Sequence, residues 1–250
     1  GWSAETIKAF SLGYCSYDKL VQALTKRGYS HEVLGEARVI HEQLFNKRIL
    51  FPIKDTSGRI VGFAGRTLLE ASVAKEKGVQ KYVNSDSSAL YRKSNTLYNI
   101  DKVRGDTVWI VEGYADVISL WQKGITDVVG LGGVAFTEEH IQALLKKGVR
   151  TIVLCLDTDK KGQESEARIL GQITRRHGLS VLVKDRDECK DPDLCLQTHD
   201  FLLTAGTKSM CDYFLEKYQA SGNKGDRDKA LRSIILEPSK IDRDKLCKRI

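Results

Sequence analysis

Thr107-Val-Trp-Ile-Val-Glu-Gly-Tyr-Ala-Asp116 runs from mostly apolar residues into a glycine and two carboxylates. The apolar part has the length and β-branched content of a buried strand. Gly113 permits a tight turn beside a ligand, so Glu112 would lie at the carboxyl end of this strand. Asp116 follows one helical turn later, and a helix beginning near residue 113 would put both carboxylates on one face. The plainer alternatives are a surface position for Glu112 and an ordinary first-turn acid for Asp116.

Two more acidic pairs follow apolar runs further along the chain. Asp157 and Asp159 come after Thr151-Ile-Val-Leu-Cys-Leu156, and Asp191 and Asp193 come after a third apolar run. In a parallel sheet the carboxyl ends of the strands lie at one edge, where ligands of open α/β sheets bind. Carboxylates gathered there repel one another unless cations neutralise them, and such hard oxygen ligands suit Mg²⁺ or Mn²⁺. We therefore expect a metal-dependent phosphoryl-transfer centre.

These motifs also have ordinary explanations. A helix cap accounts for one of Asp157 and Asp159, though not for both, and Asp191-Pro-Asp193 is common turn chemistry. Gly130-Leu-Gly-Gly133 could cradle a phosphate with backbone amides, but it is not a Walker loop, because Lys and Ser/Thr are missing where that motif needs them. The order of the three acidic clusters, each after an expected strand, favours the metal site.

Strands and helices alternate between residues 106 and 195, which predicts a small parallel sheet with right-handed helical crossovers. Expected strands cover residues 107–111, 127–131, 151–156 and 180–184, and expected helices cover 114–123, 137–147 and 160–176.

The flanking regions have different patterns. Short helices, the first capped by Ser3, are expected before residue 46. Two strands at 48–55 and 59–66 form a hairpin around Thr56-Ser57-Gly58, and an exposed loop is expected at 70–80. Helices are expected at 201–219, at 227–236 and from residue 242. The predicted fold class is α/β, with an α+β lobe at 1–105, a parallel-sheet α/β domain at 106–195 and a helical bundle at 196–250.

The net charge of +7 is unevenly distributed. Residues 1–105 hold 17 Lys and Arg against 10 Asp and Glu, whereas residues 106–195 hold 12 against 15. A basic lobe and an acidic domain suit a polyanion on the first and cations on the second, although solvated surface lysines would give the same balance.

Composition argues against two other classes of protein. No stretch approaches the roughly 18 consecutive apolar residues that a membrane helix needs, so no membrane partner is expected. The six cysteines form no Cys-x-x-Cys pair, which disfavours a zinc site. We expect reduced thiols in an intracellular protein.

Several motifs together resemble a known family. Val111-Glu-Gly-Tyr-Ala-Asp-Val117, Leu131-Gly-Gly-Val-Ala-Phe-Thr137 and Asp157-Thr-Asp-Lys-Lys-Gly162 are similar to the three signature segments of a TOPRIM domain, in particular that of the bacterial replicative (DnaG-type) primases. The likeness extends upstream to the basic lobe of that family, in these segments: Arg48-Ile-Leu-Phe-Pro-Ile53, Gly58-Arg-Ile-Val-Gly-Phe-Ala-Gly-Arg66, Lys81-Tyr-Val-Asn-Ser85 and Leu90-Tyr-Arg-Lys93. Gly133 and Lys160 depart from the family pattern, which has Thr and Arg there.

The resemblance implies an RNA polymerase core that makes short RNA primers on single-stranded DNA from ribonucleoside triphosphates. Two Mg²⁺ or Mn²⁺ ions would support nucleotidyl transfer. Glu112, Asp157 and Asp159 are the expected catalytic residues, and Asp157 is the expected bridging ligand. The expected metal set is Glu112, Asp116, Asp157, Asp159, Asp191 and Asp193, in which Asp116 is either a ligand or a group that positions one, and Glu112 is alternatively a general base.

The resemblance also implies a phosphate-binding set, because guanidinium and ammonium groups suit phosphate oxygens. Arg66, Lys81 and Lys93 would contact the triphosphate or the template phosphates. Tyr82 would stack on a base or ribose, and Asn84 would hydrogen-bond to one. The alternative is that these are ordinary surface residues of a hairpin lobe.

Further partners follow from the resemblance alone. They are the single-stranded DNA template, the RNA primer product, and a replicative helicase bound through a downstream domain that is missing here, as is an upstream zinc-binding domain. The expected location is the cytoplasm, at the nucleoid or replication fork. The rival functions are another TOPRIM nuclease or topoisomerase-like enzyme, and a nucleic-acid-binding module without catalysis.

Overall fold

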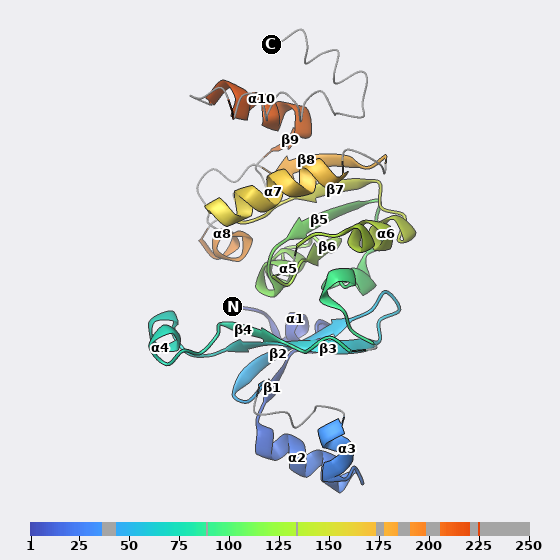
Figure 1. Ribbon diagram of the computed structural model, residues 1–250, viewed down its shortest axis with the longest axis vertical. Coiled ribbons are helices and arrows are strands. Elements are labelled where there is room, and N and C mark those ends of the chain that lie inside the picture. The colour runs from blue at the N-terminus through green and yellow to red at the C-terminus, as the bar shows by residue number, and fades with distance from the viewer. Residues whose placement is uncertain are drawn as a thin grey trace. The chain divides into compact units, whose positions relative to one another are not determined.

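The computed structural model consists of two compact units, one from Trp2 to Arg92 and one from Lys93 onward (Figure 1). The structure describes residues 1–36, 44–88, 90–133, 135–173, 178–184, 191–198, 206–220 and residue 225.

The first unit is built on an antiparallel sheet with the strand order β1-β2-β3-β4. The predicted hairpin is confirmed as β2 and β3, and Gly58 in its turn has a φ of +85°, which favours glycine. Ser3 caps the first helix by accepting a hydrogen bond from the Thr6 N–H. The strands are β1 Gly13–Cys15, β2 Arg48–Lys54, β3 Ile60–Thr67 and β4 Tyr82–Asn84, and the helices are α1 Ala4–Ala9, α2 Tyr17–Lys26, α3 His31–Glu36 and α4 Ala71–Glu76.

The prediction of an exposed loop at 70–80 is wrong for the residues that form α4. Ala74 is 6% exposed and anchors this short helix. Gly78 then adopts a φ of +62°, which lets the Val79 N–H donate to the Ala74 carbonyl at 2.8 Å. A glycine in the left-handed region after the last turn is a common helix ending, and this signal was present in the sequence.

The second unit is built on a sheet with the strand order β6-β5-β7-β8-β9, and Figure 1 shows its helices flanking the strands. Strands β5 to β8 are parallel, as predicted, and the predicted helices between them are present. The strands are β5 Thr107–Val111, β6 Val128–Gly130, β7 Thr151–Leu154, β8 Ser180–Lys184 and β9 Thr207–Ser209; the helices are the short 3₁₀ turns η1 Lys93–Asn95 and η2 Ile100–Lys102, then α5 Tyr114–Gln122, α6 Glu138–Lys146, α7 Lys160–Ile173, α8 Pro192–Thr198 and α10 Met210–Ala220.

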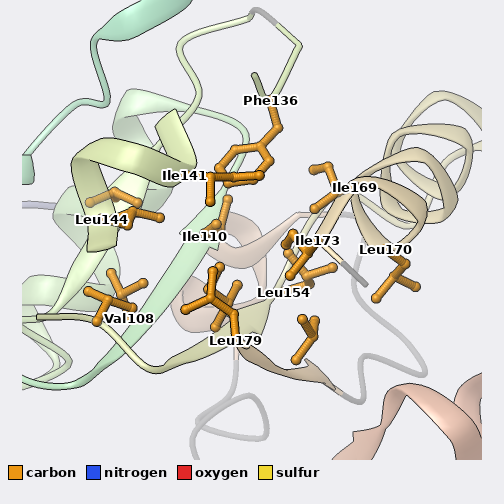
Figure 2. Close-up of a cluster of buried hydrophobic side chains, with 14 of the residues drawn as sticks. Val108, Ile110, Phe136, Ile141, Leu144, Leu154, Ile169, Leu170, Ile173 and Leu179 are labelled. Atoms are coloured by element: carbon orange, nitrogen blue, oxygen red, sulfur yellow. The ribbon is translucent and has the colours of Figure 1, made fainter. Parts of the chain in front are cut away.

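The core of this unit lies between the sheet and helices α6 and α7. Figure 2 shows side chains from both helices converging on those of the strands. Ile110 and Leu154 are inaccessible to solvent, as are Leu144 of α6 and Ile169 of α7. Burial of such side chains is worth about 1.5–3 kcal/mol each, so this layer fixes the strands whose ends carry the acidic residues.

The region after residue 200 differs from the prediction. Residues 207–209 were expected to be helical but form β9, which pairs antiparallel with β8, and α10 begins only at Met210. The exposed backbone of the edge strand β8 offers a pairing partner that helix periodicity cannot reveal. The helices expected at 227–236 and from residue 242 lie outside the described residues.

The cysteines agree only partly with the expectation of reduced thiols. Cys15 and Cys155 are free and buried, whereas Cys195 is disulfide-bonded. Within the described part of the chain, no helix has the length and apolar character to cross a bilayer.

A buried arginine connects three segments of the first sheet by hydrogen bonds. Arg48, at the start of β2, is only 8% exposed. Its Nη1 donates to the carbonyl of Gln80 at 2.8 Å and lies 3.4 Å from the carbonyls of Gly65 and Lys81. The guanidinium therefore connects β2, β3 and the chain entering β4.

We predict that Arg48→Leu destabilises this unit by about 2–3 kcal/mol, because one buried and two partly buried carbonyls lose a charged donor. Urea unfolding would measure the change. Arg59→Leu, on the same hairpin, is the matched control: its side chain is 80% exposed and pairs with Asp55, so the loss should stay below about 1 kcal/mol. Equal losses in the two variants would contradict the prediction.

Candidate active site

Two adjacent strands bring Glu112 and Asp157 together. Strands β5 and β7 are hydrogen-bonded neighbours, and Ile110 lies opposite Leu154. Glu112 and Asp157 each follow the end of one of these strands. The Asp157 N–H donates to Glu112 Oε1 at 3.2 Å. Residues 45 positions apart in the chain are thus in direct contact at the carboxyl edge of the sheet.

The turn that follows Asp157 is closely packed against this pair. A Cβ on Gly162 would lie 2.0 Å from the Asp157 carbonyl oxygen and 2.9 Å from Glu112 Oε1, so only glycine fits. The Gly162 N–H donates to Asp159 Oδ1 at 2.9 Å. Asp159 is exposed and caps the first turn of α7. Both aspartates predicted here therefore lie at the edge, and one of them also has the ordinary role of a cap.

Asp116 uses both carboxylate oxygens to hold backbone. It lies in the first turn of α5 and is 6% exposed. Its Oδ2 accepts from the Gly113 N–H and its Oδ1 accepts from the Asp193 N–H, each at 3.0 Å. Burial, with the charges of Asp191 and Asp193, raises the pKa of Asp116 to about 6 despite these hydrogen bonds. The carboxylate joins the β5–α5 turn to the segment that carries the third acidic pair.

The third acidic pair lies at the start of α8, not directly at a strand end. Asp191 Oδ1 accepts from the Leu194 N–H at 2.8 Å and caps the helix. The hydroxyl of Ser119, in α5, donates to Asp193 Oδ1. Ser119 was not among the predicted site residues, because a serine within an apolar helix carries no sequence signal for a partner 74 residues away.

The pKa of Asp157 is strongly raised by its surroundings. Burial raises its pKa to about 7, assisted by the charges of Glu112, Asp116, Asp191 and Asp159. Its Oδ1 is buried and has no hydrogen-bond partner. A buried carboxylate oxygen without a donor is costly, and a bound cation would remove this cost. The donor chemistry therefore fits a divalent metal ion.

The carboxylates do not form a complete protein cage. Among the residues that the structure describes, which include all six predicted ligands, no three His, Cys, Asp or Glu side chains converge closely enough to hold an ion by themselves. Mg²⁺ usually keeps several waters and binds through one or two carboxylates together with substrate phosphates. The arrangement suits an ion that is shared with a phosphate-bearing substrate.

The glycine-rich loop after β6 lies beside the same edge. The Gly132 N–H donates to the Glu112 carbonyl at 3.0 Å. Gly132 has a φ of +64°, and a Cβ there would lie 2.6 Å from the Tyr114 hydroxyl. Glycine is thus needed for close packing on Tyr114, a residue that the sequence did not single out. Phosphate binding by this loop stays a prediction.

The predicted phosphate-binding residues are divided between the two units. In the first unit, Arg66 lies opposite Tyr82 across β3 and β4. The Arg66 guanidinium carbon is 5.8 Å, and Lys81 Nζ 6.0 Å, from the centre of the Tyr82 ring. Asn84 follows two positions after Tyr82 on β4, so it faces the same side of the sheet. Lys93 belongs to the second unit.

The chain is similar to DNA primases along most of its length. Two family models match, one described as "DNA primase catalytic core, N-terminal domain" over residues 1–104 and one described as "Toprim-like" over residues 109–196. A DNA primase from Deinococcus radiodurans is 38% identical over an alignment of 255 positions, which covers 95% of this chain and 43% of the relative. The chain spans less than half the length of the curated relatives it matches.

Solved structures show the same fold. A DNA primase domain from Pseudomonas aeruginosa has a TM-score of 0.75 and 25% identity, over 100% of this chain and 84% of that one. A DnaG primase catalytic domain bound to single-stranded DNA has a TM-score of 0.77 and 23% identity, with the same coverage.

We predict that the metal-free protein loses stability as the pH rises from about 4 to 7. The pKa of Asp157 is higher in the folded chain than its ordinary 3.8, so the folded state binds more protons in this window and deprotonation favours unfolding. Asp157→Asn should flatten this dependence and raise the melting temperature at pH 8 by a few degrees, since ~1 kcal/mol shifts it by about 2–4 °C at this chain length.

Thermal melts in the presence of a chelator would measure this effect. Asp18→Asn, which removes an exposed carboxylate of α2, is the control for loss of charge and should retain the wild-type pH dependence. A melting temperature of Asp157→Asn that falls with pH as steeply as that of the wild type would contradict this prediction.

Proposed function

Because the chain belongs to the DnaG-type primase family, we propose that it is the RNA polymerase core of a DNA primase, which synthesises short RNA primers on single-stranded DNA. The observation that carries the proposal is the contact between Glu112 and Asp157 at the ends of neighbouring parallel strands. Family membership implies metal-dependent nucleotide chemistry, and the buried, unpartnered oxygen of Asp157 supplies a place for a cation.

In the proposed reaction, a ribose 3′-hydroxyl attacks the α-phosphate of a ribonucleoside triphosphate and pyrophosphate leaves. Two bound Mg²⁺ or Mn²⁺ ions would lower the pKa of the hydroxyl and neutralise charge on the leaving group. Asp157 and Glu112 are the proposed principal ligands, and Asp159 and the pair Asp191 and Asp193 would complete the set. We retain the alternative that Glu112 acts as general base.

We assign Asp116 to positioning. Both of its oxygens already accept backbone N–H bonds, from Gly113 and Asp193, and a carboxylate engaged in this way is better suited to orienting ligands than to binding an ion itself. Its hydrogen bond to the start of α8 would hold Asp191 and Asp193 near the edge that carries Asp157.

Basic residues of each unit would bind phosphates of the nucleotide or of the template. Arg66 and Lys81 present two cations beside the Tyr82 ring, which suits a phosphate next to a stacked base or ribose. Asn84 would contribute a hydrogen bond. Lys93, which belongs to the unit that holds the carboxylates, would also contact phosphate.

The proposed partners are single-stranded DNA as template, the RNA primer as product, and a replicative helicase that binds through a downstream domain. An upstream zinc-binding domain and a location at the replication fork are part of the same proposal. The solved primase domain bound to single-stranded DNA supports the template. Affinity for the template should fall with rising salt, because phosphate contacts release counterions.

We predict that Asp157→Asn lowers primer synthesis by about 10³-fold or more, which corresponds to ~4 kcal/mol of lost transition-state stabilisation. Binding of single-stranded DNA should stay within about twofold of the wild type, since the basic residues are intact. Incorporation of labelled ribonucleotides on a single-stranded template with Mn²⁺ measures primer synthesis. Fluorescence anisotropy measures binding of single-stranded DNA.

Asp106→Asn is the matched control for this experiment. Asp106 is exposed and lies at the opposite end of β5, so its loss should leave synthesis unchanged. Full synthesis by Asp157→Asn would refute the metal assignment, and a shortened template instead of an extended product would identify a nuclease.

We also predict that Arg66→Ala raises the KM for ribonucleoside triphosphates about tenfold with a smaller change in kcat, because a charged hydrogen bond to phosphate is worth roughly 1.5–3 kcal/mol. Lys77→Ala, an exposed lysine at the end of α4, is the control for loss of surface charge. An unchanged KM for Arg66→Ala would remove this arginine from the nucleotide site.

A further inference from the structure

The segment that begins with Lys93 is fixed at its far end to the catalytic sheet. After η1, the chain reaches Tyr98, whose N–H donates to the Gly130 carbonyl at 2.9 Å. The Gly130 N–H donates back to the Tyr98 carbonyl at 3.1 Å. This antiparallel bridge attaches the segment to the end of β6, next to the loop that contacts Glu112.

The near end of the segment is held by two side chains at the start of α6. The Thr137 hydroxyl donates to the Ser94 carbonyl at 2.5 Å. His140 Nε2 lies 3.2 Å from the Lys93 carbonyl. The backbone of Lys93 and Ser94 is therefore bound by side chains from one helical turn.

The ring of His140 has one arrangement that satisfies all of its contacts. Its Nδ1 faces the Thr137 N–H at 3.2 Å and must accept, so Nε2 carries the proton and donates to the Lys93 carbonyl. Burial lowers the pKa of His140, which keeps the ring neutral, although the Lys93 carbonyl and the charge of Glu139 oppose this shift. The ring is inaccessible to solvent and thus cannot touch a substrate.

Helix capping alone does not explain these residues. Thr137 and His140 form reciprocal cap hydrogen bonds, and a Glu or Gln at the position of His140 would usually do the same. An imidazole has a second nitrogen that the cap does not need. In His140 this nitrogen, Nε2, donates to the backbone carbonyl of Lys93. The neighbours Phe136 and Ile141 point into the core (Figure 2) and are each 1% exposed, which fixes the turn in place.

We propose that Thr137 and His140 are positioning residues that hold the backbone of Lys93 so that its ammonium group can bind the phosphates of the incoming nucleotide. The inference rests on the proposed function. It assigns to the carboxylate-bearing unit its own phosphate-binding lysine, whose backbone is held by α6 and whose segment is attached to β6.

Two variants remove the contacts to the Lys93 segment and keep the helix cap. His140→Gln retains an oxygen that can accept from the Thr137 N–H but lacks the ring that reaches Lys93. Thr137→Asp retains an acceptor for the His140 N–H and loses the hydroxyl proton that binds Ser94. Gln142→Ala, an exposed change on the same helix, is the matched control.

The kinetic test couples these variants to Lys93. His140→Gln and Thr137→Asp should each raise the KM for ribonucleoside triphosphates about five- to tenfold, the effect of one lost hydrogen bond, with kcat within about twofold. Lys93→Ala should raise the KM by a similar factor, and the double variant Lys93→Ala/His140→Gln should be no worse than Lys93→Ala alone. Multiplicative effects in the double variant would overturn the proposal.

Hydrogen exchange provides a readout that does not depend on activity. Amides of residues 93–98 should exchange faster in His140→Gln and Thr137→Asp, whereas those of β5 and β7 should keep the wild-type rates, as should both segments in Gln142→Ala. Unchanged exchange at 93–98 refutes the positioning role whatever the kinetics show. If the wild-type protein makes no primer at all, the proposed function has failed, and the two failures are thereby distinguished.

Discussion

The candidate site depends on two acidic side chains that the fold brings together. Parallel pairing of β5 and β7 places Glu112 and Asp157 at one edge of the sheet, where the backbone of one donates to the side chain of the other. Burial and the neighbouring carboxylates raise the pKa of Asp157 to about 7. Such an arrangement is unfavourable without a counter-charge, and perturbed carboxylates of this kind cluster at functional sites.

Backbone N–H groups and close packing maintain this arrangement. Asp116 accepts from two N–H groups and joins α5 to the start of α8. Asp157 and Glu112 pack so closely around Gly162 that no side chain fits at this position. The apolar layer beneath, from Ile110 to Ile169, fixes the strand ends. The carboxylates are thus held in place by the fold itself.

Much of this was accessible from the sequence, because alternating apolar runs predict a parallel sheet and parallel strands have a common carboxyl edge. The hairpin was equally clear, since Gly58 has the turn chemistry it requires. The failure at β9 depended on a tertiary contact, because β9 forms where β8 offers an edge. The failure at α4 was local, because the polar composition of residues 70–80 obscured the glycine that ends this helix. The contacts of Ser119, His140 and Arg48 join distant segments, so no local pattern could reveal them.

The most direct test of the central claim is an anomalous-diffraction experiment on crystals soaked with Mn²⁺ and a ribonucleoside triphosphate. We predict a manganese peak about 2.1 Å from a carboxylate oxygen of Asp157, within reach of Glu112 and of the nucleotide phosphates. Manganese bound only elsewhere, with Asp157 left uncoordinated in the presence of bound nucleotide, would contradict the account.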